Sequence, residues 1–348
     1  MLPLLARDRG EEVTTMDDDV LVSVQDLRKW FDLTGGIVET LLSKKRRYVK
    51  AVDGVTFDIK KGEIFGLVGE SGCGKTTTGR LIMNSIEPTG GHIYFEGNDV
   101  TTLKTIEEVK ALALKKQMIF QDPYEYLSPW LTVQGTLAEP LRIHKLVQNK
   151  EEELSRVKAV MKTVDLTPVE MLLPKYAYEL SGGQRQRVVI ARALLLNPMF
   201  IVADEPVSML DVSIRVGVLN LLLEMRRKFN LTSLFITHDI AVSRYMCDRI
   251  GVMYLGKIVE RGPSEAIIRE PLHAYTQALL TAVPVPDPKI GRSEIPIKGR
   301  IPTSEYDIIG CRFAPRCPYA SDTCSSEEPE LVEVEKDHFV ACHRSLKQ

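Results

Sequence analysis

One segment of the chain has the residue types and spacing that can hold a phosphate. Residues 69–76 follow the form GxxxxGK[ST], between an apolar run over Ile64 to Val68 and a helical pattern that starts at Thr76. Glycines let successive backbone N–H groups turn onto phosphate oxygens, and the start of a helix adds partial positive charge. Lys75 can reach the outer phosphates, and the Thr76 hydroxyl can hold Mg²⁺. The segment therefore predicts a nucleoside triphosphate site, made by Gly69, Ser71, Gly72, Cys73, Gly74, Lys75, Thr76 and Thr77.

Further polar residues follow this loop at the ends of predicted strands. Asp204 and Glu205 come directly after the apolar run 199–203, Gln121 follows Ile119 and Phe120, and His238 follows a run over 232–236. An acid at the tip of a buried strand can hold Mg²⁺ beside the phosphates, which fits Asp204. The neighbouring Glu205 could polarise an attacking water, and His238 could bond the outer phosphate. Gln121 could touch the metal or the water, so that the set predicts hydrolysis of the triphosphate.

A second group with anion-binding character lies further along the chain. Ser181-Gly182-Gly183 precedes a helical pattern that starts at Gln184, and a helix start can bind an anion. Ser208 to Asp211 follows the acidic pair at once. Each of these elements alone has an ordinary structural explanation, such as a helix cap or a solvated turn. Their occurrence together, in this order after the phosphate loop, is what favours a site.

The elements that must position these residues alternate between strand and helix. Strands are predicted at 21–28, 51–60, 63–69, 92–95, 116–120, 199–203, 232–236 and 250–254, and helices at 75–86, 151–164, 184–196, 212–229, 240–246 and about 272–282. Such alternation predicts an α/β fold with a mostly parallel sheet. Residues 124–180 are unevenly helical and indicate an inserted helical subdomain. After Arg261, prolines interrupt the pattern and predict a linker-like stretch.

Composition limits the class of protein and its surroundings. The chain has 348 residues with 44% hydrophobic and 26% charged residues, which is ordinary for a globular protein. The net charge of −2 creates no global field that would recruit nucleic acid. No apolar stretch approaches the roughly 20 residues that span a bilayer, and the N-terminal segment lacks the pattern of a secretory signal. We therefore expect a cytoplasmic protein that other subunits bring to a membrane if it works there.

The combined motifs resemble the nucleotide-binding subunit of ATP-binding-cassette (ABC) transporters over residues 20–262. The resemblance implies a P-loop ATPase domain with a mostly parallel sheet, an antiparallel β subdomain and an inserted helical subdomain. It also implies a head-to-tail dimer in which each ATP lies between one chain's phosphate loop and the partner's Ser181, Gly182, Gly183, Gln184 and Asp211. An aromatic residue before the core usually stacks on adenine. We choose Phe31, with Trp30 and Tyr48 as alternatives.

Three further stretches resemble the ATPase subunits of dipeptide and oligopeptide importers: residues 118–129, 270–284, and 310–318 with 341–343. The resemblance implies two transmembrane permeases, an extracytoplasmic substrate-binding protein and a second ATPase subunit, either a copy or a related chain. It places the protein at the cytoplasmic face of the membrane. Oligosaccharides or metal ions are alternative cargoes, and a soluble ABC ATPase without a transporter is the alternative class.

Four cysteines, Cys311, Cys317, Cys324 and Cys342, crowd the C-terminal region. Their spacing lacks the tight C-x₂₋₄-C pair of most zinc sites, and Cys317 is followed by proline, which is compatible with an iron–sulfur cluster. All four positions match importers of this kind that carry a [4Fe–4S] cluster. Zinc, or free and transiently oxidised thiols, are the alternatives. The predicted organisation is a disordered tail (1–20), the ATPase domain (21–262, with the helical subdomain at about 122–181) and the extension (263–348).

Overall fold

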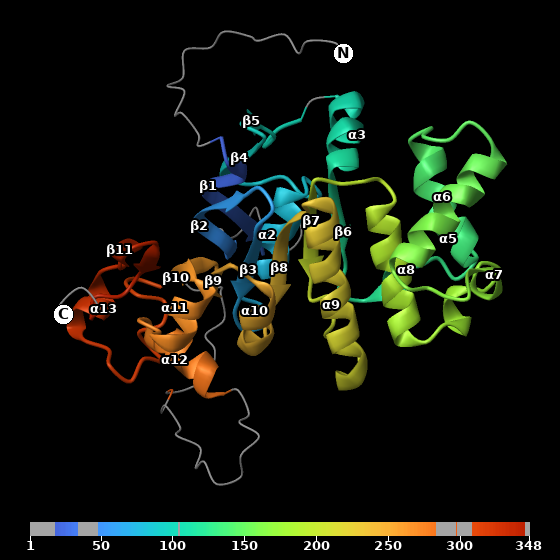
Figure 1. The fold of residues 1–348 in the computed structure, drawn as a ribbon. Coiled ribbons are helices and arrows are strands. Elements are labelled where there is room, and N and C mark those ends of the chain that lie inside the picture. Colours follow the sequence, from blue (N-terminus) through green and yellow to red (C-terminus); the bar gives the residue numbers. More distant parts are fainter. Residues whose placement is uncertain (1–17, 34–47, 104, 283–296, 298–307, 345–348) are drawn as a thin grey trace.

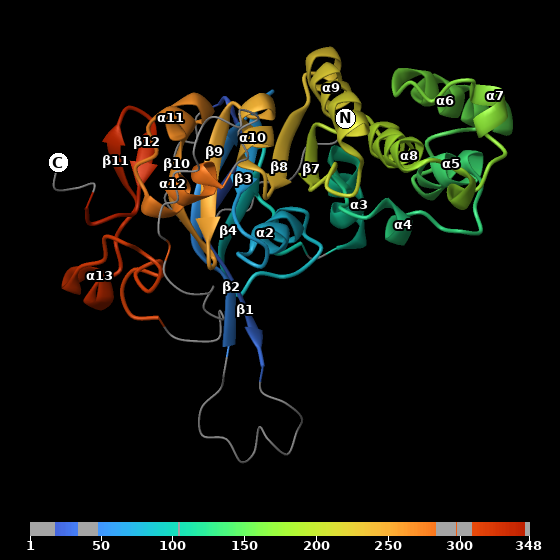
Figure 2. The ribbon, with the colours of Figure 1, turned by 90° about the horizontal axis from the view of Figure 1, so that it is seen from below.

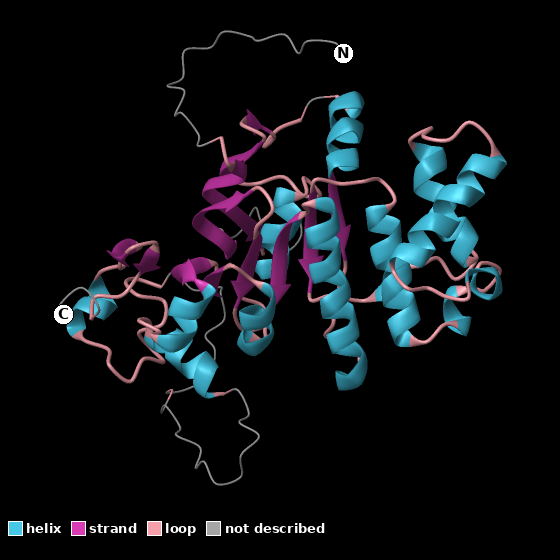
Figure 3. Ribbon diagram, in the orientation of Figure 1, coloured by secondary structure: helices cyan, strands magenta, loops and turns pink. Residues whose placement is uncertain are grey.

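The computed structural model describes residues 18–33, 48–103, 105–282, 297 and 308–344. A large sheet forms the centre of this part of the chain, with a small antiparallel sheet beside it (Figure 1). A group of helices lies at one end of the large sheet, and the C-terminal segment lies at the other end. The predicted α/β class is therefore confirmed, and Figure 3 shows the strands between two sets of helices. The predicted tail falls largely outside the described residues, and Val20 already begins the first strand.

The large sheet has eight strands in the order β11-β12-β10-β9-β3-β8-β7-β6. Neighbours from β9 to β6 run parallel, whereas β10, β12 and β11 are added in antiparallel fashion. All residues of β3 and β7 are buried, as expected for strands covered on both faces. The strands are β3 (Ile64–Val68), β6 (Lys116–Ile119), β7 (Phe200–Asp204), β8 (Thr232–Thr237), β9 (Arg249–Tyr254), β10 (Lys257–Pro263), β11 (Val332–Glu335) and β12 (His338–Val340).

The small sheet is the antiparallel subdomain that the resemblance implied. Its strands, in the order β2-β1-β4-β5, are β1 (Val20–Asp32), β2 (Tyr48–Lys60), β4 (Gly90–Phe95) and β5 (Asn98–Asp99). Helix α3 (Ile106–Lys115) follows and begins with a capping box in which Thr105 and Glu108 satisfy each other's backbone N–H groups. The basic run at 44–47 lies outside the described residues.

The predicted insert contains several short helices next to one edge of the large sheet (Figure 2). They are α4 (Pro123–Tyr126), α5 (Val133–Ile143), α6 (Lys150–Thr163), α7 (Val169–Leu172) and the 3₁₀ turn η1 (Ala177–Glu179), followed by α8 (Gly182–Leu194). The amphipathic helix predicted at 151–164 is α6, which buries Val157 and Met161. The helix predicted from Gln184 begins two residues earlier, at Gly182.

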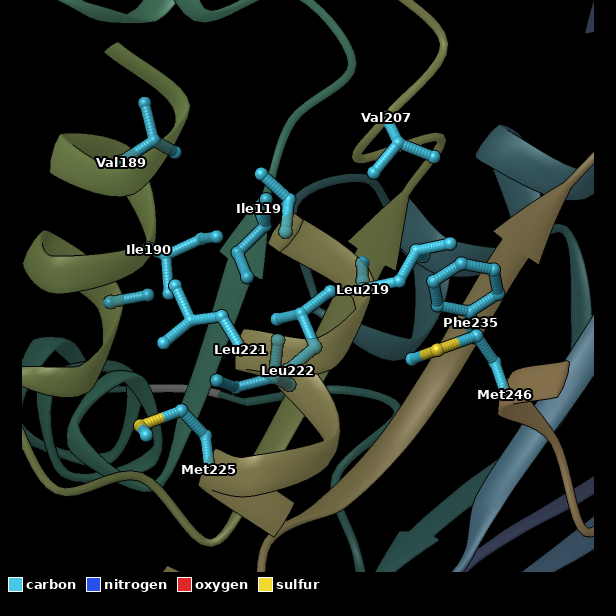
Figure 4. Packing of buried hydrophobic residues seen from close by; sticks show 14 of the residues in the cluster. Ile119, Val189, Ile190, Val207, Leu219, Leu221, Leu222, Met225, Phe235 and Met246 are labelled. Atoms are coloured by element: carbon cyan, nitrogen blue, oxygen red, sulfur yellow. The ribbon is translucent and has the colours of Figure 1, made fainter. Parts of the chain in front are cut away.

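Three further helices cover the parallel strands: α2 (Lys75–Ile82), α9 (Val212–Phe229) and α10 (Ile240–Met246). The predictions for α9 and α10 are confirmed to the residue, whereas α2 is four residues shorter than predicted. Leu219 and Leu222 of α9 lie in one buried cluster with Ile190 of α8 and Phe235 of β8 (Figure 4). The same cluster also contains buried residues of α5 and α6, so it joins the helical insert to the sheet.

The C-terminal segment is built onto the core, and the linker-like stretch predicted after Arg261 contains a helix at 264–269 that was not predicted. Helices α11 (Ser264–Arg269) and α12 (Ala274–Thr281) follow β10 directly, and α13 (Asp322–Ser326) precedes β11. Pro263 is the N-cap residue of α11, a position where a missing backbone N–H costs little. The helix predicted at 272–282 is α12. Pro271 lies between α11 and α12, and the later prolines of the proposed linker lie outside the described residues.

A buried polar cluster attaches this segment to β10. Glu260, which is completely buried, accepts hydrogen bonds from the backbone N–H groups of Leu272 (2.9 Å) and His273 (3.0 Å). Its carboxylate also lies 2.8 Å from His338 Nε2. His273 caps α12 by accepting from the Tyr275 N–H, and burial lowers the pKa of His273 to about 4. The neutral imidazole is therefore part of the folded structure.

We predict that His273 makes the folded state acid-sensitive. Because its folded pKa lies below the ordinary value of 6.5, the unfolded chain takes up the proton first, and stability falls as pH drops from 6.5 towards 4. The loss at pH 5 is about 2 kcal/mol. His273→Asn keeps a capping acceptor and removes this titration. Urea unfolding at pH 7 and pH 5 should show a loss about 2 kcal/mol larger in the wild type, and equal losses would contradict the prediction.

Candidate functional site

The phosphate loop joins β3 to α2 and depends on glycine at two close contacts. A Cβ on Gly69 would lie 2.1 Å from the Met253 carbonyl oxygen, and one on Gly74 would lie 2.0 Å from that of Ala51. Gly74 also has φ of 109°, a conformation that other residues rarely adopt. The sequence thus folds this loop tightly against β2 and β9, with Ser71 and Gly72 exposed at its outer side.

Lys75 is held inside the loop. Its ammonium donates to the backbone carbonyls of Gly69 (2.7 Å) and Glu70 (3.0 Å), and the residue is only 5% exposed. Cys73 is buried beside it, and burial raises the pKa of the Cys73 thiol. Cys73 is therefore placed as a packing residue whose backbone belongs to the loop. Thr76 and Thr77 lie in the first turn of α2.

Two of the three residues predicted to bind Mg²⁺, Thr76 and Asp204, meet at the end of β7, whereas Gln121 contacts Glu205. The Thr76 hydroxyl donates to Asp204 Oδ1 at 3.1 Å, which joins the start of α2 to the last residue of β7. Burial raises the pKa of the Asp204 carboxyl, although the Thr76 hydrogen bond opposes this. A hydroxyl and a carboxylate are ligands that Mg²⁺ prefers. The two side chains thus fit a magnesium ion held between the phosphate loop and β7.

Three of the predicted catalytic residues meet at Glu205. Its Oε2 atom lies 3.1 Å from Gln121 Nε2 and 3.1 Å from His238 Nδ1. Gln121 lies two residues beyond β6 and His238 one residue beyond β8, so three strand ends supply the cluster. Glu205 has φ of 45°, which turns the chain out of the strand directly after Asp204. The arrangement holds one carboxylate oxygen between two polar side chains.

The Ser181 group forms a separate cluster at the start of α8. Ser181 and Gln184 form a capping box, with hydrogen bonds of 3.0 and 3.3 Å. A Cβ on Gly183 would lie 2.6 Å from Ile214 of α9, so this glycine is needed for close packing. Asp211 is the exposed N-cap residue of α9 and makes no capping bond with its side chain. In Figure 1, strands β7 and β6 and helix α9 lie between α8 and α2.

The candidate adenine-stacking residues lie on β1 and β2. Phe31 is 42% exposed, with the Lys29 ammonium 5.3 Å from the centre of its ring. Trp30 donates its indole N–H to Asp53 (2.9 Å), and its ring centre lies 6.3 Å from that of Tyr48. Of the three, Trp30 is held by a hydrogen bond to Asp53, and Phe31 has an exposed ring.

The four C-terminal cysteines line one pocket. Cys311, Cys317, Cys324 and Cys342 surround it together with Phe313 and His343. The Cys311 N–H donates to the Cys324 carbonyl at 2.8 Å. Burial, with smaller effects of Cys324 and Cys342, raises the pKa of Cys311 to about 11. Within the described residues, no group of three or more His, Cys, Asp or Glu side chains is placed to hold a single metal ion.

Sequence reasoning missed the residues that hold the phosphate loop from the C-terminal segment. The Tyr275 hydroxyl accepts a hydrogen bond of 2.8 Å from the Glu70 N–H, inside the loop. Burial raises the pKa of Tyr275 far above its usual value, so the hydroxyl stays protonated. Tyr275 belongs to a stretch that carried the resemblance to importers, but a single tyrosine has no local signal for such a distant contact.

Two family models match the chain. Residues 52–208 match the ABC transporter family, and residues 259–324 match the oligopeptide/dipeptide transporter C-terminal region. The putative oligopeptide transport ATP-binding protein YkfD of Bacillus subtilis is 46% identical over 93% of this chain and 95% of its own length. The chain belongs to the ATP-binding subunits of ABC transporters of the oligopeptide/dipeptide type. It has ATPase activity as a member of this family.

Other relatives and solved structures agree with this family. The oligopeptide transport ATP-binding protein AppF of B. subtilis is 44% identical over 95% of this chain and 99% of its own length. The dimeric structure of the ATP-binding cassette MJ0796 in a post-hydrolysis state covers 70% of this chain and 99% of that one, with 28% identity and a TM-score of 0.60. In the part of the chain that is described, no helix has the length and apolar character needed to cross a membrane.

We predict that Lys75→Ala weakens ATP binding by about 10- to 100-fold, the usual effect of losing hydrogen bonds to a charged group. Titration with a fluorescent ATP analogue measures the Kd. Lys110→Ala, which removes an exposed lysine from α3, is the matched control and should leave the Kd unchanged. An unaltered ATP affinity in Lys75→Ala would contradict the assignment of the phosphate loop.

Proposed function

We propose that the chain is the ATP-hydrolysing subunit of an importer of dipeptides or oligopeptides. The observation that carries the proposal is the C-terminal match at residues 259–324, in a chain whose relatives are named as oligopeptide transport or peptide import ATP-binding proteins. Oligosaccharide or metal-ion cargo is the rival for the same machinery. The ligand retained by the associated substrate-binding protein separates these cargoes, and a peptide is the expected result.

The chain works as one half of an ATP-dependent dimer. Each ATP lies between the phosphate loop of one cassette and Ser181, Gly182 and Gly183 of the other, which is a copy or a related chain. The separation of α8 from α2 in Figure 1 supports this, because Ser181 caps α8 and the chain's own loop leads into α2. Two permeases hold the dimer at the cytoplasmic face of the membrane, and an extracytoplasmic binding protein supplies the cargo.

Hydrolysis uses the cluster around Glu205. Glu205 takes a proton from the attacking water as general base, and its oxygen is oriented by the contacts of 3.1 Å to Gln121 and His238. Lys75 and His238 stabilise charge on the γ-phosphate. Thr76, Asp204 and Gln121 would hold Mg²⁺, which would neutralise phosphate charge. Because Gln121 also leads into the helical insert, the same contact links the site to the permeases.

The remaining predicted contacts complete the nucleotide site. Phe31 stacks on adenine, which its exposed ring permits, while Trp30 and Tyr48 are the alternatives. Asp211 and Gln184 belong to the surface that meets the second cassette. The exposure of Asp211 and the lack of a capping bond leave its carboxylate available there.

We also propose that the four cysteines hold a [4Fe–4S] cluster. Support comes from their convergence on one pocket. Thiolates are the usual ligands of such clusters. The cluster lies outside the hydrolysis residues, so its part is structural or redox-sensing.

We predict that Glu205→Gln keeps ATP binding and slows hydrolysis by at least about 100-fold, as expected when a general base is lost. Phosphate release and peptide uptake, measured in proteoliposomes with the permeases, should fall together. Glu224→Gln, a change in the middle of α9, serves as the control and should leave both rates unchanged. Retained turnover in Glu205→Gln would exclude Glu205 as the base.

We predict that anaerobically purified protein contains about four iron and four acid-labile sulfide per chain, the stoichiometry of one cubane cluster. Replacing Cys311 or Cys342 with serine should lower both contents, whereas Cys247→Ser, a core position, should not. Protein that contains no iron but has a normal fold and normal ATPase activity would remove the cluster from the proposal.

A further inference from the structure

The turn between Cys311 and Cys317 lies against the phosphate loop and forms a bidentate ion pair with it. Arg316 Nη1 lies 2.8 Å from Glu70 Oε2, and Nη2 lies 3.0 Å from Oε1. The side chain of Arg316 is 8% exposed and that of Glu70 is 26% exposed. Glu70 is the residue after Gly69, and its carbonyl accepts from Lys75. The pair thus joins the cysteine turn to the segment that holds Lys75.

An aromatic cluster fixes Arg316 in this position. Phe313, which is 1% exposed, packs edge-on against Tyr254 with ring centres 5.3 Å apart and also contacts Tyr275 at 5.5 Å. Arg316 Nη1 lies 3.4 Å from the Tyr254 hydroxyl. Tyr275 in turn accepts from the Glu70 N–H. The carboxylate and the N–H of Glu70 are therefore both held by groups outside the loop.

A second arginine of the same turn supports the other side of the loop. Arg312 donates to the Leu255 carbonyl and pairs with Asp53. The next residue along the chain, Gly256, donates its N–H to the Cys73 carbonyl at 2.8 Å. Arg316 therefore contacts Glu70 directly, and Arg312 is linked to Cys73 through residues 255 and 256. The turn thus supports both ends of residues 70–73.

The negative charge of Glu70 makes its pairing with Arg316 important for ATP binding. A carboxylate next to a site for a triphosphate repels the ligand unless a cation neutralises it. The bidentate geometry fixes the direction of the carboxylate as well as its charge. Removing the cation would leave a partly buried carboxylate unpaired beside the phosphates.

We propose that Arg316 is a positioning residue for the phosphate loop, through which the cysteine turn sets the affinity for ATP. The inference rests on the proposed role of this loop in binding ATP. It adds that part of the affinity is determined by a residue of the C-terminal segment that lies beside Cys317 and outside every nucleotide-binding motif.

The test compares the Kd of a non-hydrolysable ATP analogue across variants of the pair in the full chain. Arg316→Gln should raise the Kd about 10-fold, the effect of losing hydrogen bonds between charged groups, with kcat at saturating ATP changed less than about twofold. The double variant Arg316→Gln with Glu70→Gln should have a Kd between those of the wild type and Arg316→Gln, because the unpaired carboxylate is gone.

The control is Arg142→Gln, which removes a bidentate pair with Glu153 in the helical insert and should leave the Kd unchanged. If Arg316→Gln does not fold, Arg316→Lys keeps the charge and should raise the Kd by about threefold, as one hydrogen bond is lost. A folded variant with wild-type Kd, or a double variant as weak as Arg316→Gln, overturns the inference. If the wild type itself binds no ATP, the proposed function fails instead.

Discussion

Parallel pairing of β3, β8 and β7 is the constraint on which the site depends. Parallel strands end at the same edge of a sheet, so residues far apart in the sequence arrive together there. Gly69 follows β3, Asp204 ends β7, and His238 follows β8. The registers of β3 with β8 and of β7 with β8 place these ends side by side. The contacts of Thr76 with Asp204 and of Glu205 with His238 result from this pairing.

The C-terminal segment shows that the phosphate loop is supported from both sides. On one side, the carbonyl groups of Ala51 in β2 and Met253 in β9 pack closely against the loop. On the other side, Tyr275 and Arg316 of the C-terminal segment contact it. These supports come from segments separated by as many as 246 positions in the chain. The loop is thus a local motif whose shape is fixed by contacts that are not local.

The sequence predicted most of the fold and several residues that the structure brings together at the strand ends, because both have local signals. Apolar runs such as Met199 to Ala203 mark buried strands, and helix caps such as Ser181 mark helix starts. The helix at 264–269 was missed, since proline is compatible with helix starts as well as with linkers. The role of Arg316 was also missed. The contact of Arg316 with Glu70 is determined by tertiary packing around Phe313, and no local sequence pattern predicts it.

The positions of β11 and β12 also affect the solubility of the protein, because these strands cover the edge of β10. β10 exchanges backbone hydrogen bonds with β9 on one side and with β12 on the other. Without β12, a long strand with the apolar residues Ile258 and Val259 would present unpaired N–H and C=O groups to other molecules. β11 instead ends the sheet with four residues that include the exposed Glu333 and Glu335. A short, negatively charged outermost strand is a poor template for another chain, so the extension disfavours strand pairing with other molecules at this edge of the sheet.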